Sequence, residues 1–192
     1  MKISPAYRRE QEILHAFTEY GTASVKYAPL VSEIVNRLKV EELLDYGSGR
    51  GNLMAFLQAD HKVRIQCYDP ALPEFAADPV PMQMCVAIDV LEHIEPECLD
   101  AVLDDLVRCT GVVGLFTICS RPAEKELTDG RNAHLIQEPL EWWLPKLWAR
   151  FDLQTVQRTG PDDFHVIAYA RGLEDEPQVE AEQQQIVLAK AH

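Results

Sequence analysis

The hydrophobic pattern of the chain changes from a helical period to a strand-like period near residue 40. Before that point, apolar residues recur at helical spacing in two segments, one starting at Ser4 and one near Pro29. After it, short apolar or alternating runs that suit strands are interleaved with amphipathic segments that suit helices. The clearest runs lie at 43–45, 63–68, 84–88 and 112–118. Strands interleaved with helices predict an α/β domain with a mostly parallel sheet.

The end of the chain carries a different pattern. An amphipathic segment at 141–151 precedes two further runs, 151–159 and 164–170, which a short turn containing Gly and Pro joins. We expect these two runs to form an antiparallel strand pair, because a turn this short joins only antiparallel neighbours. The acidic, Gln-rich residues 172–192 are predicted to be a mobile tail.

Three glycines alternate with other residues directly after the first strand. The strand ends at Asp45, and Gly47, Gly49 and Gly51 follow before an apolar helical pattern begins. Glycine lacks a Cβ atom, so its backbone can take up positive φ angles and approach a ligand closely. The helix that follows offers unpaired N–H groups at its first turn. Such a turn, at the carboxyl end of a strand in an open α/β sheet, predicts a nucleotide-like ligand.

The spacing of this turn differs from the dinucleotide-binding fingerprint G-x-G-x-x-G. Here it reads G-x-G-x-G, with Asn52 where the third glycine of the fingerprint would fall, and Asp45 suits a cationic ligand group better than a phosphate. Asp69 ends the next strand roughly 20 positions later, where a ribose-binding carboxylate belongs, and Pro70 stops that strand. Taken singly, these features also fit an ordinary strand–helix turn and a turn-starting Asp-Pro pair.

A third segment follows the apolar run at 84–88 and reads Asp89-Val90-Leu91-Glu92-His93-Ile94. The glycine turn resembles the acidic-x-G-x-G-x-G motif of class I S-adenosylmethionine (SAM)-dependent methyltransferases. The third segment resembles the D-V-L-E-H-[IV] sequence that ends the fourth strand of many small-molecule enzymes of that class. With Asp69 between them, the three segments stand in the matching order, and the resemblance covers residues 40–120.

The resemblance implies a Rossmann-like, doubly wound, mostly parallel sheet that is closed by an antiparallel strand. It implies a SAM-binding methyltransferase domain at 39–171 and N-terminal capping helices within 1–38, over the ligand cleft. SAM would be the cofactor, S-adenosylhomocysteine (SAH) its product, and a small molecule or metabolite the acceptor. The implied cofactor-binding residues are Asp45, Gly47, Ser48, Gly49, Gly51, Asn52, Asp69, Pro70, Asp89 and Val90.

One segment departs from the resemblance. Residues 71–83 contain three prolines and are short, whereas related enzymes often have a further strand there and a residue that contacts adenine. Only the stretch from Phe75 to Asp78 offers such a contact, so the adenine site is not assigned from the sequence.

Three residues are candidate catalytic groups. Methyl transfer needs an acceptor held in line with the methyl group and, for some acceptors, a base. Glu92 and His93 follow the strand at 84–88, and His134 lies in the loop after the strand at 112–118, at the sheet edge where ligands bind. An imidazole titrates near neutral pH and can take up a proton. The alternative is that these histidines only pack in the core.

Four residues are predicted to contact the acceptor. Arg131 and Asn132 belong to the same loop as His134, and an arginine fork suits a carboxylate or phosphate. Tyr20 and Tyr27 bound a hydroxyl-rich stretch between the two N-terminal helices. A structural role without acceptor contact is the alternative for both pairs. The loop with Arg131 and Asn132 could be a surface turn, and the stretch between Tyr20 and Tyr27 could simply connect the two helices.

Composition and charge narrow the range of partners. The formal net charge of −13 over 192 residues disfavours attraction to nucleic-acid phosphates. No apolar run approaches the roughly 20 residues of a membrane span and the N-terminus carries no apolar signal segment, so a cytoplasmic protein is expected. The 5 cysteines include no C-x-x-C pair, so neither a disulfide framework nor a metal site is predicted. A homo-oligomer or a protein partner at the C-terminal region stays open.

Two other function classes also stay open. The chain could bind SAM or SAH without catalysis, as a regulatory or assembly subunit, or it could be a nucleotide-dependent oxidoreductase with an unusual glycine turn. Nucleic-acid base methylation fits less well. Asp89-Val90-Leu91-Glu92 stands where DNA amino-methyltransferases usually show [DNS]-P-P-[YFW], and the chain has no Pro-Cys pair like that of cytosine-C5 enzymes.

Overall fold

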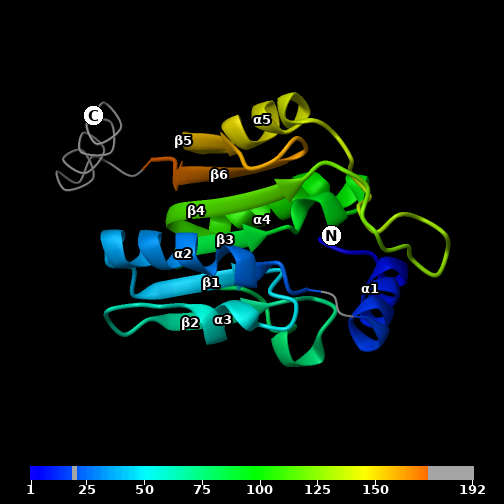
Figure 1. Ribbon diagram of the computed structural model, residues 1–192, viewed down its shortest axis with the longest axis horizontal. Helices are drawn as coiled ribbons and strands as arrows, with labels where there is room; N and C mark the ends of the chain where they lie inside the picture. The colour runs from blue at the N-terminus through cyan, green and yellow to red at the C-terminus, as the bar shows by residue number, and fades with distance from the viewer. Residues whose placement is uncertain (19–20, 173–192) are drawn as a thin grey trace.

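The computed structural model describes residues 1–18 and 21–172. In this part of the chain, one six-stranded sheet runs through the centre in the order β2-β1-β3-β4-β6-β5 (Figure 1). The strands are β1 (Glu42–Tyr46), β2 (Arg64–Tyr68), β3 (Met82–Ile88), β4 (Thr110–Cys119), β5 (Phe151–Arg158) and β6 (Asp163–Ala170). The α-helices are α1 (Pro5–Phe17), α2 (Ser24–Leu38), α3 (Asn52–Phe56), α4 (Leu99–Cys109) and α5 (Leu140–Trp148). Short 3-10 helices lie at Pro73–Phe75, Leu91–His93 and Pro96–Cys98.

The strand directions confirm the predicted Rossmann-like, doubly wound sheet. β1 to β4 are parallel to one another, whereas β6 pairs antiparallel with β4, and β5 pairs antiparallel with β6. Because β1 to β4 share one direction, their carboxyl ends meet at one edge of the sheet. The strand order reverses between β1 and β3, and ligands of open α/β sheets bind outside the strand ends at such a switch point.

Each face of the sheet carries its own hydrophobic core, because successive residues of a strand point to opposite faces. Leu43 of β1 packs on the face that α2 covers, while Leu44 packs on the face that α4 and α5 cover. β4 alternates in the same way, with Leu115 on the α2 face and Phe116 on the other. The central strands are therefore buried on both sides, which explains why they read as continuous apolar runs.

Two helix boundaries differ from the sequence expectation. α2 begins at Ser24 and not near Pro29, because the burial of Tyr27 in the core outweighs the hydrogen bond that Pro29 cannot donate. The helix predicted to reach residue 151 ends at Trp148. Phe151 instead starts β5, where it pairs with Ala170 and is fully buried.

Both N-terminal helices were predicted to cap the ligand cleft, but mainly α1 lies there. α1 lies beside the carboxyl ends of the strands, whereas α2 covers a face of the sheet and reaches the strand ends only with its first residue (Figure 1). The segment 71–83 between β2 and β3 contains one 3-10 helix, Pro73–Phe75. Its last two residues, Met82 and Gln83, belong to β3. Residues 173–192, most of the predicted tail, lie outside the described residues. Within 1–18 and 21–172, no helix is both long and apolar enough to cross a membrane.

Candidate functional site

A cavity of about 480 Å³ opens at the carboxyl edge of the sheet. Its size lies within the roughly 300–1,000 Å³ that is usual for small-molecule sites. Its walls come from the ends of β1 to β4, from α1, and from residues 21–24, which we call the connector because they link α1 to α2. The predicted cofactor-binding residues that line it are Asp45, Gly47, Ser48, Gly49, Asp69, Pro70, Asp89 and Val90.

The glycine turn forms one wall of the cavity through Gly47, Ser48 and Gly49. Gly47 and Gly49 have positive φ angles of 72° and 51°. A Cβ atom on Gly47 would lie 2.6 Å from the side chain of Val90, and one on Gly49 would lie 2.7 Å from the Cα atom of Gly21. The turn therefore requires glycine both for its backbone angles and for the close approach of its neighbours.

Asp69 is held at the end of β2 by backbone N–H groups. Its two carboxylate oxygens accept hydrogen bonds from the N–H of Gly49 (3.1 Å) and of Ala71 (3.0 Å). Nε2 of His15 in α1 lies 3.8 Å from Oδ2 of Asp69. Burial raises the pKa of Asp69, and the two N–H donors together with His15 partly offset that rise. The carboxyl group is thus fixed in place, while each oxygen keeps acceptor capacity for a ligand.

Asp45 is the more deeply buried of the two carboxyl groups. It is 1% exposed, and its Oδ2 atom has no hydrogen-bond partner among the described residues. Burial, reinforced by the charge of Asp69, raises the pKa of Asp45 to about 7. A buried carboxylate is unfavourable without a donor or a cation beside it. Because Asp45 lines the cavity, a cationic ligand group would supply that partner.

His93 and His134 meet edge to face in the cavity wall, with ring centroids 4.6 Å apart. Nδ1 of His93 lies 2.7 Å from the carbonyl oxygen of Ala133, and Nδ1 of His134 lies 2.6 Å from that of Arg121. A carbonyl oxygen only accepts, so each Nδ1 carries a proton and each neutral ring keeps a lone pair on Nε2. Burial lowers the pKa of both rings, that of His93 to about 3, so both are neutral at neutral pH.

Glu92 lies behind the cavity wall and does not line the cavity. Its side chain is fully buried, and Oε1 accepts a hydrogen bond from the N–H of Cys119 at 2.9 Å. Oε2 has no hydrogen-bond partner within the described structure. Burial, with the nearby Asp89, raises the pKa of Glu92 well above its ordinary value. Because Glu92 does not line the cavity, it is not placed to act by itself as a base on a ligand there.

Solved structures match this arrangement, although no family model and no curated protein sequence matches the chain. The 1,6-didemethyltoxoflavin N1-methyltransferase of Burkholderia thailandensis, solved with 1,6-didemethyltoxoflavin and SAH bound, has a TM-score of 0.61 at 17% identity. The match covers 88% of this chain and 91% of that chain. An O-methyltransferase family protein of B. thailandensis has a TM-score of 0.55 at 12% identity, over 81% of this chain and 59% of that one. An rRNA methylase of Escherichia coli has a TM-score of 0.53 at 10% identity, over 88% and 78%.

The chain has the class I methyltransferase fold. Two of the residues that the methyltransferase motifs implied as cofactor contacts stand outside the cavity. Gly51 and Asn52 start α3 behind the glycine turn, where a Cβ atom on Gly51 would lie 3.1 Å from the ring of Phe75. Of the two predicted tyrosine contacts, Tyr27 belongs to α2 and is buried in the hydrophobic core, and Tyr20 lies outside the described residues.

The loop before α5 does not bring its predicted acceptor contacts to the cavity. Arg131 forms an ion pair with Asp129 on the exposed side of the loop, at 2.7 Å. Asn132 stabilises the loop itself, since its side-chain amide accepts from the N–H of Ala123 and donates to the carbonyl oxygen of the same residue. Of the predicted residues in this loop, the structure places His134 alone in the cavity wall.

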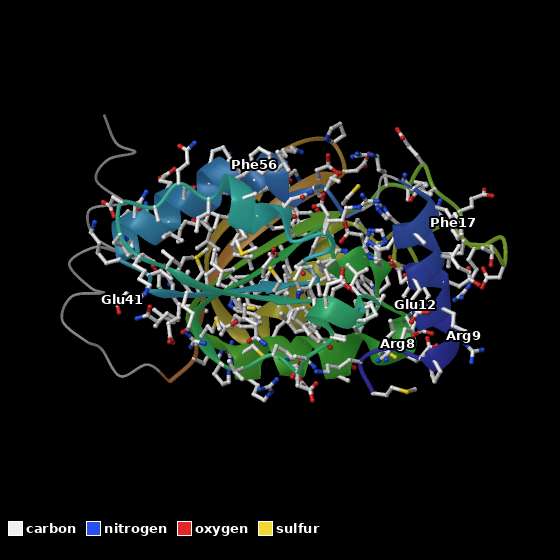
Figure 2. All side chains as sticks on the ribbon, turned by 90° about the horizontal axis from the view of Figure 1, so that it is seen from below. Arg8, Arg9, Glu12, Phe17, Glu41 and Phe56 are labelled. Atoms are coloured by element: carbon white, nitrogen blue, oxygen red, sulfur yellow. The ribbon has the colours of Figure 1, made fainter. Side chains whose placement is uncertain are left out.

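One face of α1 contributes to the cavity, which the sequence alone did not predict. Tyr7, Gln11 and His15 are four residues apart, lie on one side of the helix and line the cavity. The Tyr7 hydroxyl donates to the carbonyl oxygen of His93 and accepts from the amide of Gln11. Arg8, on the same helix, is exposed and does not line the cavity (Figure 2). One feature of the sequence could have indicated this role of α1. Gln11 and His15 are polar, yet they follow Tyr7 at helical spacing and so lie on the same face as apolar side chains.

Gly49→Ala is expected to loosen the contact between the glycine turn and the connector. The new Cβ atom would meet the Cα and O atoms of Gly21 at 2.7 and 2.8 Å, and backbone atoms cannot swing aside as a flexible side chain can. We expect amide hydrogen exchange at residues 21–24 to accelerate by roughly tenfold or more, as measured by mass spectrometry.

Gly130→Ala is the matched control for this substitution. Gly130 also has a positive φ of 86°, but a Cβ atom there meets nothing within 4 Å. It should therefore share the backbone strain without disturbing the connector. Equal exchange at residues 21–24 in the two variants would contradict the close packing of turn and connector.

Proposed function

We propose that this chain is a SAM-dependent methyltransferase that acts on a small-molecule or metabolite acceptor. The observation that carries the proposal is the pair of buried carboxyl groups, Asp45 and Asp69, which line one cavity together with Gly47 and Gly49 of the glycine turn. SAM presents a cationic amino group and ribose hydroxyls, which are the two kinds of partner that these carboxyl groups lack. A dinucleotide would instead bring phosphates beside Asp45, where like charges repel.

The residues of the cavity fit this cofactor. Asp69 would accept hydrogen bonds from the ribose hydroxyls, and the unpaired Oδ2 of Asp45 would accept from the amino group. Gly47 and Gly49 let the turn pass close to Val90 and Gly21, and the buried hydroxyl of Ser48, unpaired among the described residues, adds a polar contact. SAM, when bound, supplies the activated methyl group.

The sheet order supports a division of the cavity into two ends. β2 and β4 lie on opposite sides of β1 and β3, so Asp69 marks one end and the residues after β4 mark the other. We assign the first end to the cofactor and the second to the acceptor. The acceptor end carries His93 and His134, whose neutral rings can hold the acceptor by a hydrogen bond or take up its proton.

Two observations favour a small acceptor over a nucleic acid. The net charge of −13 opposes the neutralisation of a phosphate backbone. The structure with a TM-score of 0.61 is an enzyme crystallised with a small heterocyclic molecule and SAH. An rRNA methylase shares the fold as well, so the fold alone does not select the acceptor.

Asp69→Ala is expected to weaken SAH binding roughly ten- to hundredfold, measured by isothermal titration calorimetry. A hydrogen bond to a charged group contributes about 1.5–3 kcal/mol, which corresponds to that range of affinity. Asp78→Ala is the matched control, because Asp78 follows the same strand but its side chain is 92% exposed and stands outside the cavity. If both variants fold and bind SAH with equal affinity, Asp69 does not contact the cofactor.

A methyl-transfer assay distinguishes an enzyme from a subunit that binds SAM or SAH without catalysis. With SAM and a panel of small hydroxyl, thiol and amine acceptors, the protein should release SAH and a methylated product, detected by mass spectrometry. Binding of SAH without turnover on any acceptor of the panel would favour the regulatory or assembly subunit.

Binding of SAH should depend on pH through Asp45. Below its pKa of about 7, Asp45 is protonated in the free protein, so a cationic amino group must displace that proton. Affinity should therefore fall by up to about tenfold for each pH unit below 7. Burial lowers the pKa of His15 and lowers that of His93 to about 3.

Asp45→Asn tests that assignment because it removes the titrating group and keeps the side-chain shape. Calorimetry between pH 6 and 8 should show weaker binding at pH 8 and a nearly constant affinity across the range. An Asp45→Asn variant whose affinity follows the wild-type pH profile would exclude Asp45 as the partner of the amino group.

A further inference from the structure

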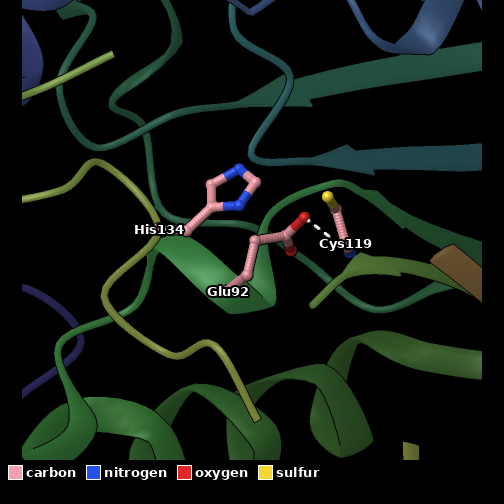
Figure 3. A group of neighbouring side chains, drawn as sticks. All are labelled: Glu92, Cys119 and His134. Atoms are coloured by element: carbon pink, nitrogen blue, oxygen red, sulfur yellow. Dashed lines mark hydrogen bonds between the residues drawn. The ribbon is translucent and has the colours of Figure 1, made fainter. Parts of the chain in front are cut away.

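Three side chains from separate parts of the chain converge at the acceptor end of the cavity. Glu92 belongs to the 3-10 helix after β3, Cys119 is the last residue of β4, and His134 lies in the loop before α5. One ligand atom from each side chain lies within 4.8 Å of the other two. Figure 3 shows the carboxyl group of Glu92 between the other two side chains, with the hydrogen bond from the Cys119 N–H to one of its oxygens.

The unpaired oxygen of Glu92 points to a missing partner. Its side chain is fully buried, Oε1 is satisfied by the Cys119 N–H, and Oε2 has no partner within the described residues. The ion pairs of the described structure do not include Glu92. A buried carboxyl oxygen of this kind normally accepts a hydrogen bond or binds a cation.

The tautomer of His134 suits a metal ligand. Its Nδ1–H donates to the carbonyl oxygen of Arg121 at 2.6 Å, which fixes the ring and leaves the lone pair on Nε2. Metal-binding histidines usually donate their second N–H to a carbonyl or carboxylate in this way, because it sets the tautomer and the ring orientation.

The donor set selects the kind of metal. One thiolate sulfur, one imidazole nitrogen and one carboxylate oxygen suit zinc and neighbouring transition ions, whereas magnesium and calcium prefer oxygen ligands alone. Bonds of roughly 2.0–2.3 Å place the ligands of tetrahedral zinc between about 3 and 4 Å apart. Small side-chain rotations would therefore close the observed spacing of at most 4.8 Å around one ion.

We propose that Glu92, Cys119 and His134 bind one zinc ion, with its fourth coordination position open to the cavity. Cys119 and His134 both line the cavity, so the open position faces the space that we assign to the acceptor. Three protein ligands and one open position are typical of catalytic zinc sites. On binding, zinc displaces the thiol proton of Cys119 and the proton of a protonated Glu92 carboxyl group, and these protons pass to solvent.

Resting on the proposed function, the site also defines an acceptor class. A hydroxyl or thiol of the acceptor would occupy the fourth position, where zinc lowers its pKa and its proton is released to water. The acceptor oxygen or sulfur then forms the bond to the methyl carbon as the bond from that carbon to the sulfonium sulfur of SAM breaks. In this arrangement Nε2 of His134 binds the metal, so His134 positions the acceptor and does not act as its base.

Metal binding by the full-length protein tests the site without any methyl transfer. After removal of metals with a chelator, cobalt(II) should bind one per chain and give a thiolate-to-cobalt charge-transfer band in the near ultraviolet. Zinc should displace the cobalt and abolish the band. No cobalt or zinc binding by the folded wild-type protein would overturn the proposal.

Single substitutions locate the ion. Cys119→Ser should remove the charge-transfer band, and His134→Gln and Glu92→Gln should each weaken zinc binding by at least about a hundredfold, beyond the 10–100-fold typical of lost outer contacts. Cys98→Ser is the matched control, because Cys98 is equally buried but lies outside the cluster. An intact band in Cys119→Ser, or its loss in Cys98→Ser, would place the metal elsewhere and overturn the proposal.

Two further measurements on the same samples show whether each variant is folded and whether it binds SAH. Circular dichroism identifies a variant that does not fold, and the two remaining ligand substitutions then decide the question. Calorimetry with SAH separates this proposal from the proposed function. Metal binding without SAH binding would contradict the cofactor assignment alone, whereas SAH binding without metal binding would contradict the zinc site alone.

Discussion

The candidate site depends on the burial of two carboxyl groups at the ends of neighbouring parallel strands. Asp45 and Asp69 face one cavity, and burial and the charge of Asp69 disfavour the ionised form of Asp45. Asp69 is stabilised by two backbone N–H groups, whereas Oδ2 of Asp45 has no such partner among the described residues. The fold therefore holds a charge pattern that a ligand with one cationic end and one hydroxyl-bearing end would complete.

The packing around the glycine turn maintains this arrangement. The backbone of the turn touches that of the connector at Gly21, and this closeness brings His15 of α1 to within 3.8 Å of Asp69. The hydroxyl of Tyr7 then links α1 to the carbonyl oxygen of His93 on the acceptor side. One helix thus contacts both ends of the cavity, so any movement of α1 would affect the cofactor and acceptor ends together.

The sequence predicted those parts of the site that are local along the chain. Asp45, Gly49 and Asp69 each stand at a strand end, and the parallel sheet brings strand ends together without further information. It did not predict contacts between distant segments, such as that between Tyr7 and His93, because a hydrophobic pattern marks the buried face of a helix but not what that face meets. Arg131, which was expected to contact the acceptor, does not line the cavity, because its guanidinium group forms an ion pair with Asp129 of the same loop.

The central claim is that the two carboxyl groups hold the two ends of one SAM molecule. A crystal structure of the protein with SAH bound tests it most directly. We predict that both ribose hydroxyls lie within hydrogen-bond distance, about 3.2 Å or less, of the carboxylate of Asp69, with the amino group beside Asp45. A ligand bound outside this cavity, or one whose ribose does not contact Asp69, would contradict the account.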